Sequence, residues 1–127
     1  MKRNIFIVGI LIVLLSIMFY SQVGKTNNVQ VSVEQSTKFS EEEINEAIVT
    51  VKKKFKEFRG CELTELWYSE SSNGMKDENT MILLSNFKVN SSGGDGSFEP
   101  NSTQSDWNWI LRRDSKNDNW RVDSWGY

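Results

Sequence analysis

The chain has 127 residues, a net charge of −2, one Cys and no His. This length leaves room for one domain and a short extension. The charge argues against a protein that binds nucleic acid, because such proteins present a cationic face to the phosphate backbone. Without His the chain cannot build a Ser-His-Asp triad, a Cys-His pair or a His-ligated zinc site, and one Cys cannot form an internal disulfide. We therefore expect no catalytic residue and no cofactor.

Residues 1–24 predict a signal-anchor helix. Lys2 and Arg3 precede an uncharged stretch, residues 4–24, which as a helix would be about 31 Å long and match the hydrocarbon core of a bilayer. The positive flank stays in the cytoplasm, so the rest of the chain would lie outside. No pair of small residues typical of a cleavage site follows the apolar run. The sequence therefore favours a single-pass anchor in a bacterial cell membrane over the alternative, a form secreted after signal cleavage.

Residues 25–38 are polar and predict a linker that lifts the following domain off the membrane. The alternation of Val29, Val31 and Val33 with polar residues leaves a second interpretation open, a short edge strand.

Residues 39–127 predict one extracytoplasmic α+β domain that begins with an amphipathic helix. Ser40 and Glu43 have the spacing of a capping box. Apolar residues then recur at intervals of three and four, up to a C-cap glycine at Gly60. Basic residues gather at the predicted end of the helix, where they complement the helix dipole. Contact with an anionic lipid or wall polymer is the alternative role for these residues.

After Gly60 the apolar period changes from 3.6 to 2, which is typical of strands. Four strands are predicted, over residues 61–69, 80–89, 106–113 and 119–125. Turn-rich segments join them, which favours antiparallel pairing. We therefore expect one amphipathic helix packed on a curved four-stranded antiparallel sheet.

The chain has five Trp, and strict strand alternation places Trp120 and Trp125 on opposite faces of the last strand. Because they cannot then all be core residues, some Trp or Tyr should line the open face of the sheet or the mouth of a cavity. The sequence favours packing in the core and on the sheet surface, and a pocket for an apolar ligand, a peptide or a sugar is the alternative. The candidate ligand-binding residues are Trp67, Trp107, Trp109, Trp125 and Tyr127.

The acidic residues Asp95, Glu99 and Asp106 raise the question of calcium, which prefers six to eight oxygen ligands. Their order lacks the spacing of an EF-hand, so the sequence favours a flexible rim loop and no metal site. The lone thiol of Cys61 is expected to be a buried packing residue.

The final segments, Trp107–Arg113 and Trp120–Tyr127, resemble the last hairpin of small exported NTF2-like (cystatin-like) domains, whose last strand carries a W-x-V-x-x-W/G signature. More narrowly, the chain is similar to DUF4829-type proteins of Firmicutes, in which a signal or anchor precedes one such domain. The resemblance covers residues 40–127 and implies a shallow, cystatin-like sheet. Members of the wider superfamily bind apolar ligands, dimerise through the sheet or use a pocket Asp-His pair. This chain has no His, so that pair is not carried over.

Taken together, these patterns predict a membrane-tethered, non-catalytic binding or protein-interaction module. Its partner would be a protein or a small apolar or sugar ligand, and not a nucleic acid. An enzyme that acts on envelope polymers through Asp or Glu is the alternative. The sequence leaves the oligomeric state open.

Overall fold

The structure is a computed structural model and describes residues 23–127. Nearly all of the predicted anchor, residues 1–24, lies outside this range, so the anchor stays a prediction. Within residues 23–127, no helix combines the length and the apolar character that a bilayer crossing requires.

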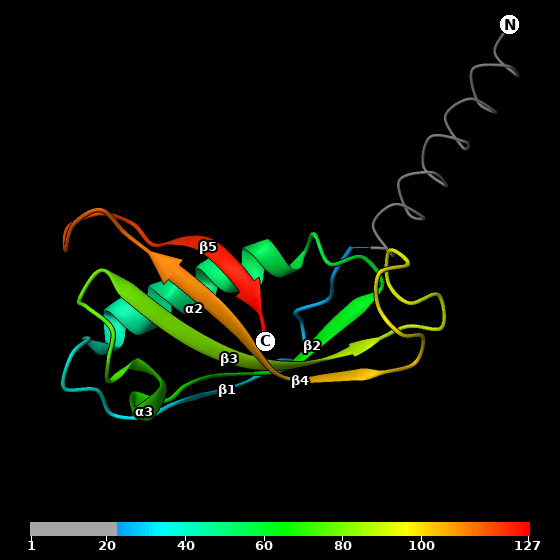
Figure 1. The fold of residues 1–127 in the computed structure, drawn as a ribbon, viewed down its shortest axis with the longest axis horizontal. Coiled ribbons are helices and arrows are strands. Elements are labelled where there is room, and N and C mark those ends of the chain that lie inside the picture. The colour runs from blue at the N-terminus through cyan, green and yellow to red at the C-terminus, as the bar shows by residue number, and fades with distance from the viewer. Residues whose placement is uncertain (1–22) are drawn as a thin grey trace, which may run out of the picture.

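Within residues 23–127, a five-stranded sheet and two helices make up the fold (Figure 1). The sheet has the order β1-β2-β3-β4-β5, with β1 parallel to β2 and all other neighbours antiparallel. Helix α2 contacts β2 and β5 and runs along one face of the twisted sheet. In chain order the elements are β1 Gln30–Val33, α2 Glu41–Phe55, β2 Cys61–Tyr68, α3 Glu70–Asn73, β3 Thr80–Val89, β4 Thr103–Arg112 and β5 Arg121–Gly126.

The prediction of a four-stranded antiparallel sheet with one helix is therefore wrong: the sheet is mixed, and α3 is a second, short helix. The alternative interpretation of the linker is confirmed, since β1 is an edge strand within residues 25–38. It runs parallel to β2 because α2 carries the chain back to the end of the sheet at which β1 began. Upstream of β1, the amide of Lys25 donates to the carbonyl of Cys61 over 2.9 Å, so this segment also pairs with the sheet.

The short helix α3 lies where the sequence predicts a turn. Asn73, at the end of α3, holds this helix against the sheet. The Asn73 side chain is fully buried. Its amide group donates to the carbonyl of Ile82 over 3.0 Å and accepts from the amide of Ile82 over 2.7 Å. One side chain thus pairs with β3 as a neighbouring strand would.

The capping box that predicts the start of α2 is confirmed. Ser40 Oγ accepts from the amide of Glu43 over 3.1 Å, and Glu43 Oε1 accepts from the amide of Ser40 over 3.0 Å. The apolar face is buried against the sheet through Ile44, Ala47, Ile48, Val51 and Phe55. The helix ends at Phe55, earlier than predicted. Gly60 is not its C-cap but turns the chain into β2 at a φ of +70°, a conformation that favours glycine.

Three bulges bend the sheet, and one of them overturns a prediction about the Trp residues. In β5, Ser124 pairs with Ile110 and Val122 pairs with Leu111, so Asp123 is an extra residue. An extra residue reverses the alternation of side chains beyond it. Trp120 and Trp125 therefore both face α2, and their predicted placement on opposite faces is wrong. The other two bulges lie at Thr64 in β2 and near Asp106 in β4.

Candidate functional site

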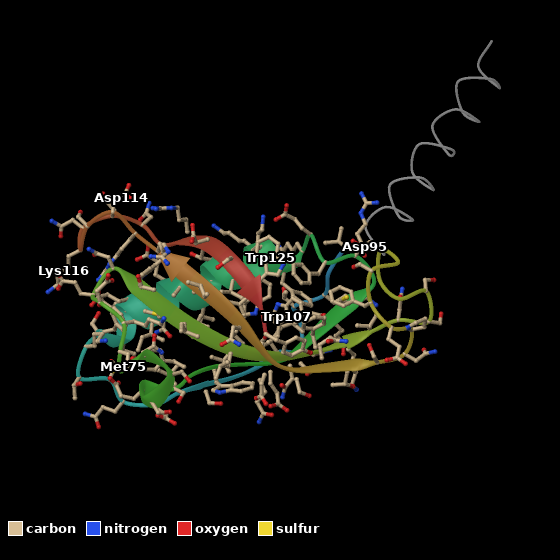
Figure 2. All side chains as sticks on the ribbon, in the orientation of Figure 1. Met75, Asp95, Trp107, Asp114, Lys116 and Trp125 are labelled. Atoms are coloured by element: carbon tan, nitrogen blue, oxygen red, sulfur yellow. The ribbon has the colours of Figure 1, made fainter. Side chains whose placement is uncertain are left out.

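A cleft of about 460 Å³ opens between the end of α2 and strands β4 and β5. Four aromatic side chains form its walls, and we call it the aromatic cleft. Figure 2 shows two of them, Trp107 and Trp125, close to the loop that carries Asp95. The walls are Phe58, Phe98, Trp107 and Trp125, and the rim is Lys54, Glu57, Arg59, Asp95 and Ser97.

Phe58 lies at the centre of the cleft wall, in the turn between α2 and β2. Its ring centroid is 5.9 Å from that of Trp125, 6.3 Å from that of Trp107 and 6.2 Å from that of Phe98. These separations are those of favourable edge-to-face and tilted aromatic pairs. Because α2 ends at Phe55, Phe58 lies outside the helix. Its side chain can therefore pack against aromatic rings from β4, from β5 and from the loop between β3 and β4.

Phe98 reaches the cleft from the loop between β3 and β4, which the sequence predicted to be flexible. Several hydrogen bonds fold this loop onto itself: Asn90 Oδ1 accepts from the amide of Gly94 over 2.9 Å, and Phe98 donates to the carbonyl of Gly93 over 3.2 Å. Gly93 has a φ of +74°, and a Cβ there would lie 2.4 Å from the Phe98 carbonyl oxygen. Glycine is therefore required for the approach that aims Phe98 at the cleft.

Trp125 gives the cleft an open aromatic surface. Its side chain is 45% exposed although it lies on the helix-facing side of the sheet. The Lys54 ammonium lies 5.1 Å from its ring centroid and 2.8 Å from the Glu57 carboxylate. The ring thus has a cation over it, and that cation is itself paired with a carboxylate; these neighbours suit a ligand that combines an apolar face with polar edges.

The indole nitrogen of Trp107 is buried and has no hydrogen-bond partner among the described residues. Beside it, the ring of Tyr127 packs against Trp107 edge-on, with centroids 5.1 Å apart, and the Tyr127 hydroxyl donates to Gln104. A buried donor without an acceptor is unfavourable, and because this atom has almost no accessible surface, a ligand in the open cleft does not reach it.

The structure brings only part of the predicted site together. Trp107 and Trp125 line the cleft, and Tyr127 adjoins it. Trp109 is fully buried, and its indole N–H donates to Ser85 Oγ over 2.8 Å, so it belongs to the core. Trp67 points to the opposite face of the sheet, because its neighbours in β2 are buried on the helix-facing side.

Sequence reasoning missed Phe58 and Phe98 as cleft residues. Phe58 continues the apolar spacing of the predicted helix, so the sequence places it in that helix. Phe98 carried a usable signal, since it is the one aromatic residue in a long polar loop. Such a residue usually anchors its loop to an apolar surface.

Asp95, Glu99 and Asp106 do not gather into one site: within residues 23–127 no three His, Cys, Asp or Glu side chains are placed to hold a metal ion. Asp106 instead occupies a bulge at a φ of +56°. At the cleft rim, hydrogen bonds from Ser97 hold the pKa of Asp95 below its usual value. Asp95 is therefore an ionised hydrogen-bond acceptor.

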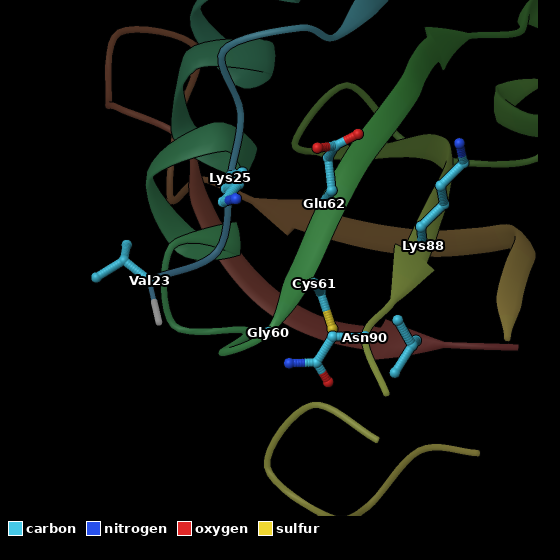
Figure 3. Close-up of a pocket in the computed structure, with 8 residues that line it drawn as sticks. Val23, Lys25, Gly60, Cys61, Glu62, Lys88 and Asn90 are labelled. Atoms are coloured by element: carbon cyan, nitrogen blue, oxygen red, sulfur yellow. The ribbon is translucent and has the colours of Figure 1, made fainter. Parts of the chain in front are cut away.

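A second hollow, of about 250 Å³, lies beside the start of β2 (Figure 3). It contains Cys61, whose side chain is buried, as predicted. Burial, together with the negative charge of Asp95, raises the pKa of this thiol to about 11. Because the thiolate is the nucleophilic form, Cys61 is not equipped for nucleophilic chemistry near neutral pH.

No protein-family model, curated protein or solved structure matches the chain. The resemblance to NTF2-like domains therefore stays a prediction from the sequence.

Proposed function

We propose that this chain is a non-catalytic binding domain, held outside a bacterial cell by residues 1–24, and that its aromatic cleft binds a sugar ring of an envelope polysaccharide. The observation that carries the proposal is the half-exposed Trp125 on the wall of an open cleft. The volume of the aromatic cleft falls within the range of small-ligand pockets, about 300–1,000 Å³. The uncharged segment behind Lys2 and Arg3 supports the external location.

A sugar ring fits this cleft better than a wholly apolar ligand does. The C–H face of a sugar ring packs on an indole, while its hydroxyl groups need hydrogen-bond donors and acceptors at the edge. The rim supplies both kinds, because Lys54 donates and Asp95 accepts.

The cleft gives less support to an enzyme that acts on the same polymers. A general acid for glycoside hydrolysis needs a raised pKa, so that it holds a proton near neutral pH. Of the two rim carboxylates, Glu57 is paired with Lys54 over 2.8 Å, and hydrogen bonds from Ser97 lower the pKa of Asp95. Such a group binds hydroxyl protons and does not donate one.

Titration of the full chain in detergent micelles with soluble envelope-polysaccharide fragments, followed by Trp fluorescence, tests the proposal. Trp125→Ala should weaken binding roughly tenfold or more, about 1.4 kcal/mol. Trp67→Ala is the matched control, since this indole lies on the other face of the sheet, and it should leave the affinity unchanged. Equal effects of the two substitutions, or no binding by the wild type, would overturn the proposal.

A further inference from the structure

The two edges of the sheet are built differently. The β5 edge carries the bulge at Asp123 and the charged side chain of Arg121, both of which hinder pairing with another strand. The β1 edge, Gln30–Val33, has no charge, no proline and no bulge, and all four of its residues are exposed. It therefore lacks the devices that usually keep an edge strand from pairing.

The hydrogen-bonding groups of β1 alternate between β2 and the open edge. The amide of Glu34, just after β1, donates to the Tyr68 carbonyl at the end of β2 over 3.2 Å. Because the direction of these groups alternates along a strand, the amides and carbonyls of Val31 and Val33 point away from β2. The side chains of these two residues are 39% and 38% exposed. Both the backbone and the apolar surface at this edge are thus available to another strand.

The segment Val29–Val33 reads the same from either end in its apolar pattern, with Val at the first, third and fifth positions. An antiparallel copy centred on Val31 would set Val31 opposite Val31 and Val29 opposite Val33. Because the backbone groups of Val31 face outward, the central Val31 pair would be a hydrogen-bonded one. Val29 lies just before β1 and is partly buried against the core. Glu34 would lie opposite Asn28, and no like charges would meet.

We propose that a second copy of this chain occupies the β1 edge, so that two β1 strands pair antiparallel about Val31 and join two sheets into one. A groove of about 490 Å³ lies beside β1 and includes Val33, Phe39 and Ile44. In this pairing the partner's Val29 would lie opposite Val33, at the border of this groove, whose lining also includes Glu34, Gln35, Ser36, Ser40 and Glu41. The surface is separate from the aromatic cleft, which β4 and β5 border.

The short distance from β1 to the predicted anchor favours a second copy over another occupant. Five residues separate residue 24 from Gln30, so two copies anchored in one membrane would hold their β1 strands in the same layer above it. Confinement of this kind raises the effective concentration of two surfaces for each other.

Cysteine cross-linking of the full chain in membranes tests the pairing. In the proposed dimer the Cα atoms of the two Val31 residues would lie about 5.5 Å apart, which suits a disulfide. Val31→Cys should therefore form a covalent dimer under mild oxidation, several-fold more than Val49→Cys. Val49 is the matched control because it is also an exposed valine (51%), on α2. Equal cross-linking of both variants would overturn the proposal, as would a cross-link from position 31 only to another protein.

A mass measurement on the detergent-solubilised chain gives a second test that needs no cysteine. The wild type should be a dimer, Val31→Lys a monomer, and Val49→Lys a dimer. Trp fluorescence would show that each variant is folded. A monomeric wild type, or a folded Val31→Lys variant that stays dimeric, would contradict pairing through β1.

Discussion

Arg113 joins the start of α2 to the end of β4, although its side chain is only 3% exposed. One guanidinium nitrogen lies 2.6 Å from the Glu43 carboxylate, and another donates to the Glu78 carbonyl over 2.7 Å. The guanidinium carbon lies 4.3 Å from the ring centroid of Trp120. The group is thus paired, hydrogen-bonded and stacked, as a buried charge must be to be tolerated.

Arg113→Leu should lower the free energy of unfolding by about 3 kcal/mol, because it leaves Glu43 and the Glu78 carbonyl without their partner. Urea unfolding followed by Trp fluorescence measures the change. Arg121→Leu is the control: Arg121 also pairs with a carboxylate, that of Asp114, but its side chain is 53% exposed. An exposed pair of this kind should contribute less than about 1 kcal/mol. Similar losses in the two variants would contradict the structural role of Arg113.

Glu43 should make stability depend on pH. Burial raises the pKa of its carboxyl, but the hydrogen bond from the Ser40 backbone and the contacts with Arg113 outweigh burial and bring the pKa below the ordinary value of 4.5. A carboxyl with a lowered folded-state pKa stabilises the fold above its unfolded-state pKa, and this contribution is lost as the pH falls through the folded value. The difference in unfolding free energy between wild type and Glu43→Gln should therefore shrink from pH 7 to pH 3. A difference that stays constant would contradict this account.

Among the elements, Asn86 in β3 ties together the bulges of both neighbouring strands. Its backbone carbonyl accepts from Thr64 Oγ1 over 3.0 Å, and its side-chain Oδ1 accepts from the amide of Asp106 over 3.0 Å. Its Nδ2 donates to Glu65 over 3.1 Å. The side chain thus supplies an acceptor that the strand ladder cannot offer to the bulged Asp106.

Asn86→Ala should cost about 1 kcal/mol of unfolding free energy, since it removes both side-chain hydrogen bonds. The matched control is Asn108→Ala in β4, because this amide makes only a long bond, of 3.3 Å, to the Asp106 carbonyl. The control should lose no more than about 0.5 kcal/mol. Chemical denaturation of the wild type and the two variants measures these free energies of unfolding. If Asn108→Ala is destabilised as much as Asn86→Ala, the role of Asn86 in holding the bulges is contradicted.

The elements with a strong local signal could be predicted from the sequence, and those that depend on distant residues could not. The capping box at Ser40 and the apolar spacing of α2 are local, and both are confirmed. The bulge at Asp123 arises from pairing with Ile110 and Leu111 in another strand, and nothing in the residues around it marks an extra position. The predicted faces of Trp120 and Trp125 failed for that reason.

At the scale of the whole molecule, strand β1 and the aromatic cleft also depend on residues that are distant in the sequence, so local patterns predict them poorly. The four residues of β1 are all exposed, and their alternation of apolar and polar side chains is only a weak signal for a strand. The parallel pairing of β1 with β2 depends on the path of α2. The sequence could single out Trp107 and Trp125 as candidates. It could not show that Phe58 and Phe98 complete the wall, or that Trp109 and Trp67 are directed elsewhere.

The central claim is that the aromatic cleft is the binding surface of this domain. Nuclear magnetic resonance of the full chain in micelles would test it most directly, because each of the five Trp gives its own indole N–H signal. On addition of an envelope-polysaccharide fragment, the signals of Trp107 and Trp125 should shift, and that of Trp67 should not move. A shift confined to Trp67, or none at saturating concentrations across a panel of such fragments, would contradict the account.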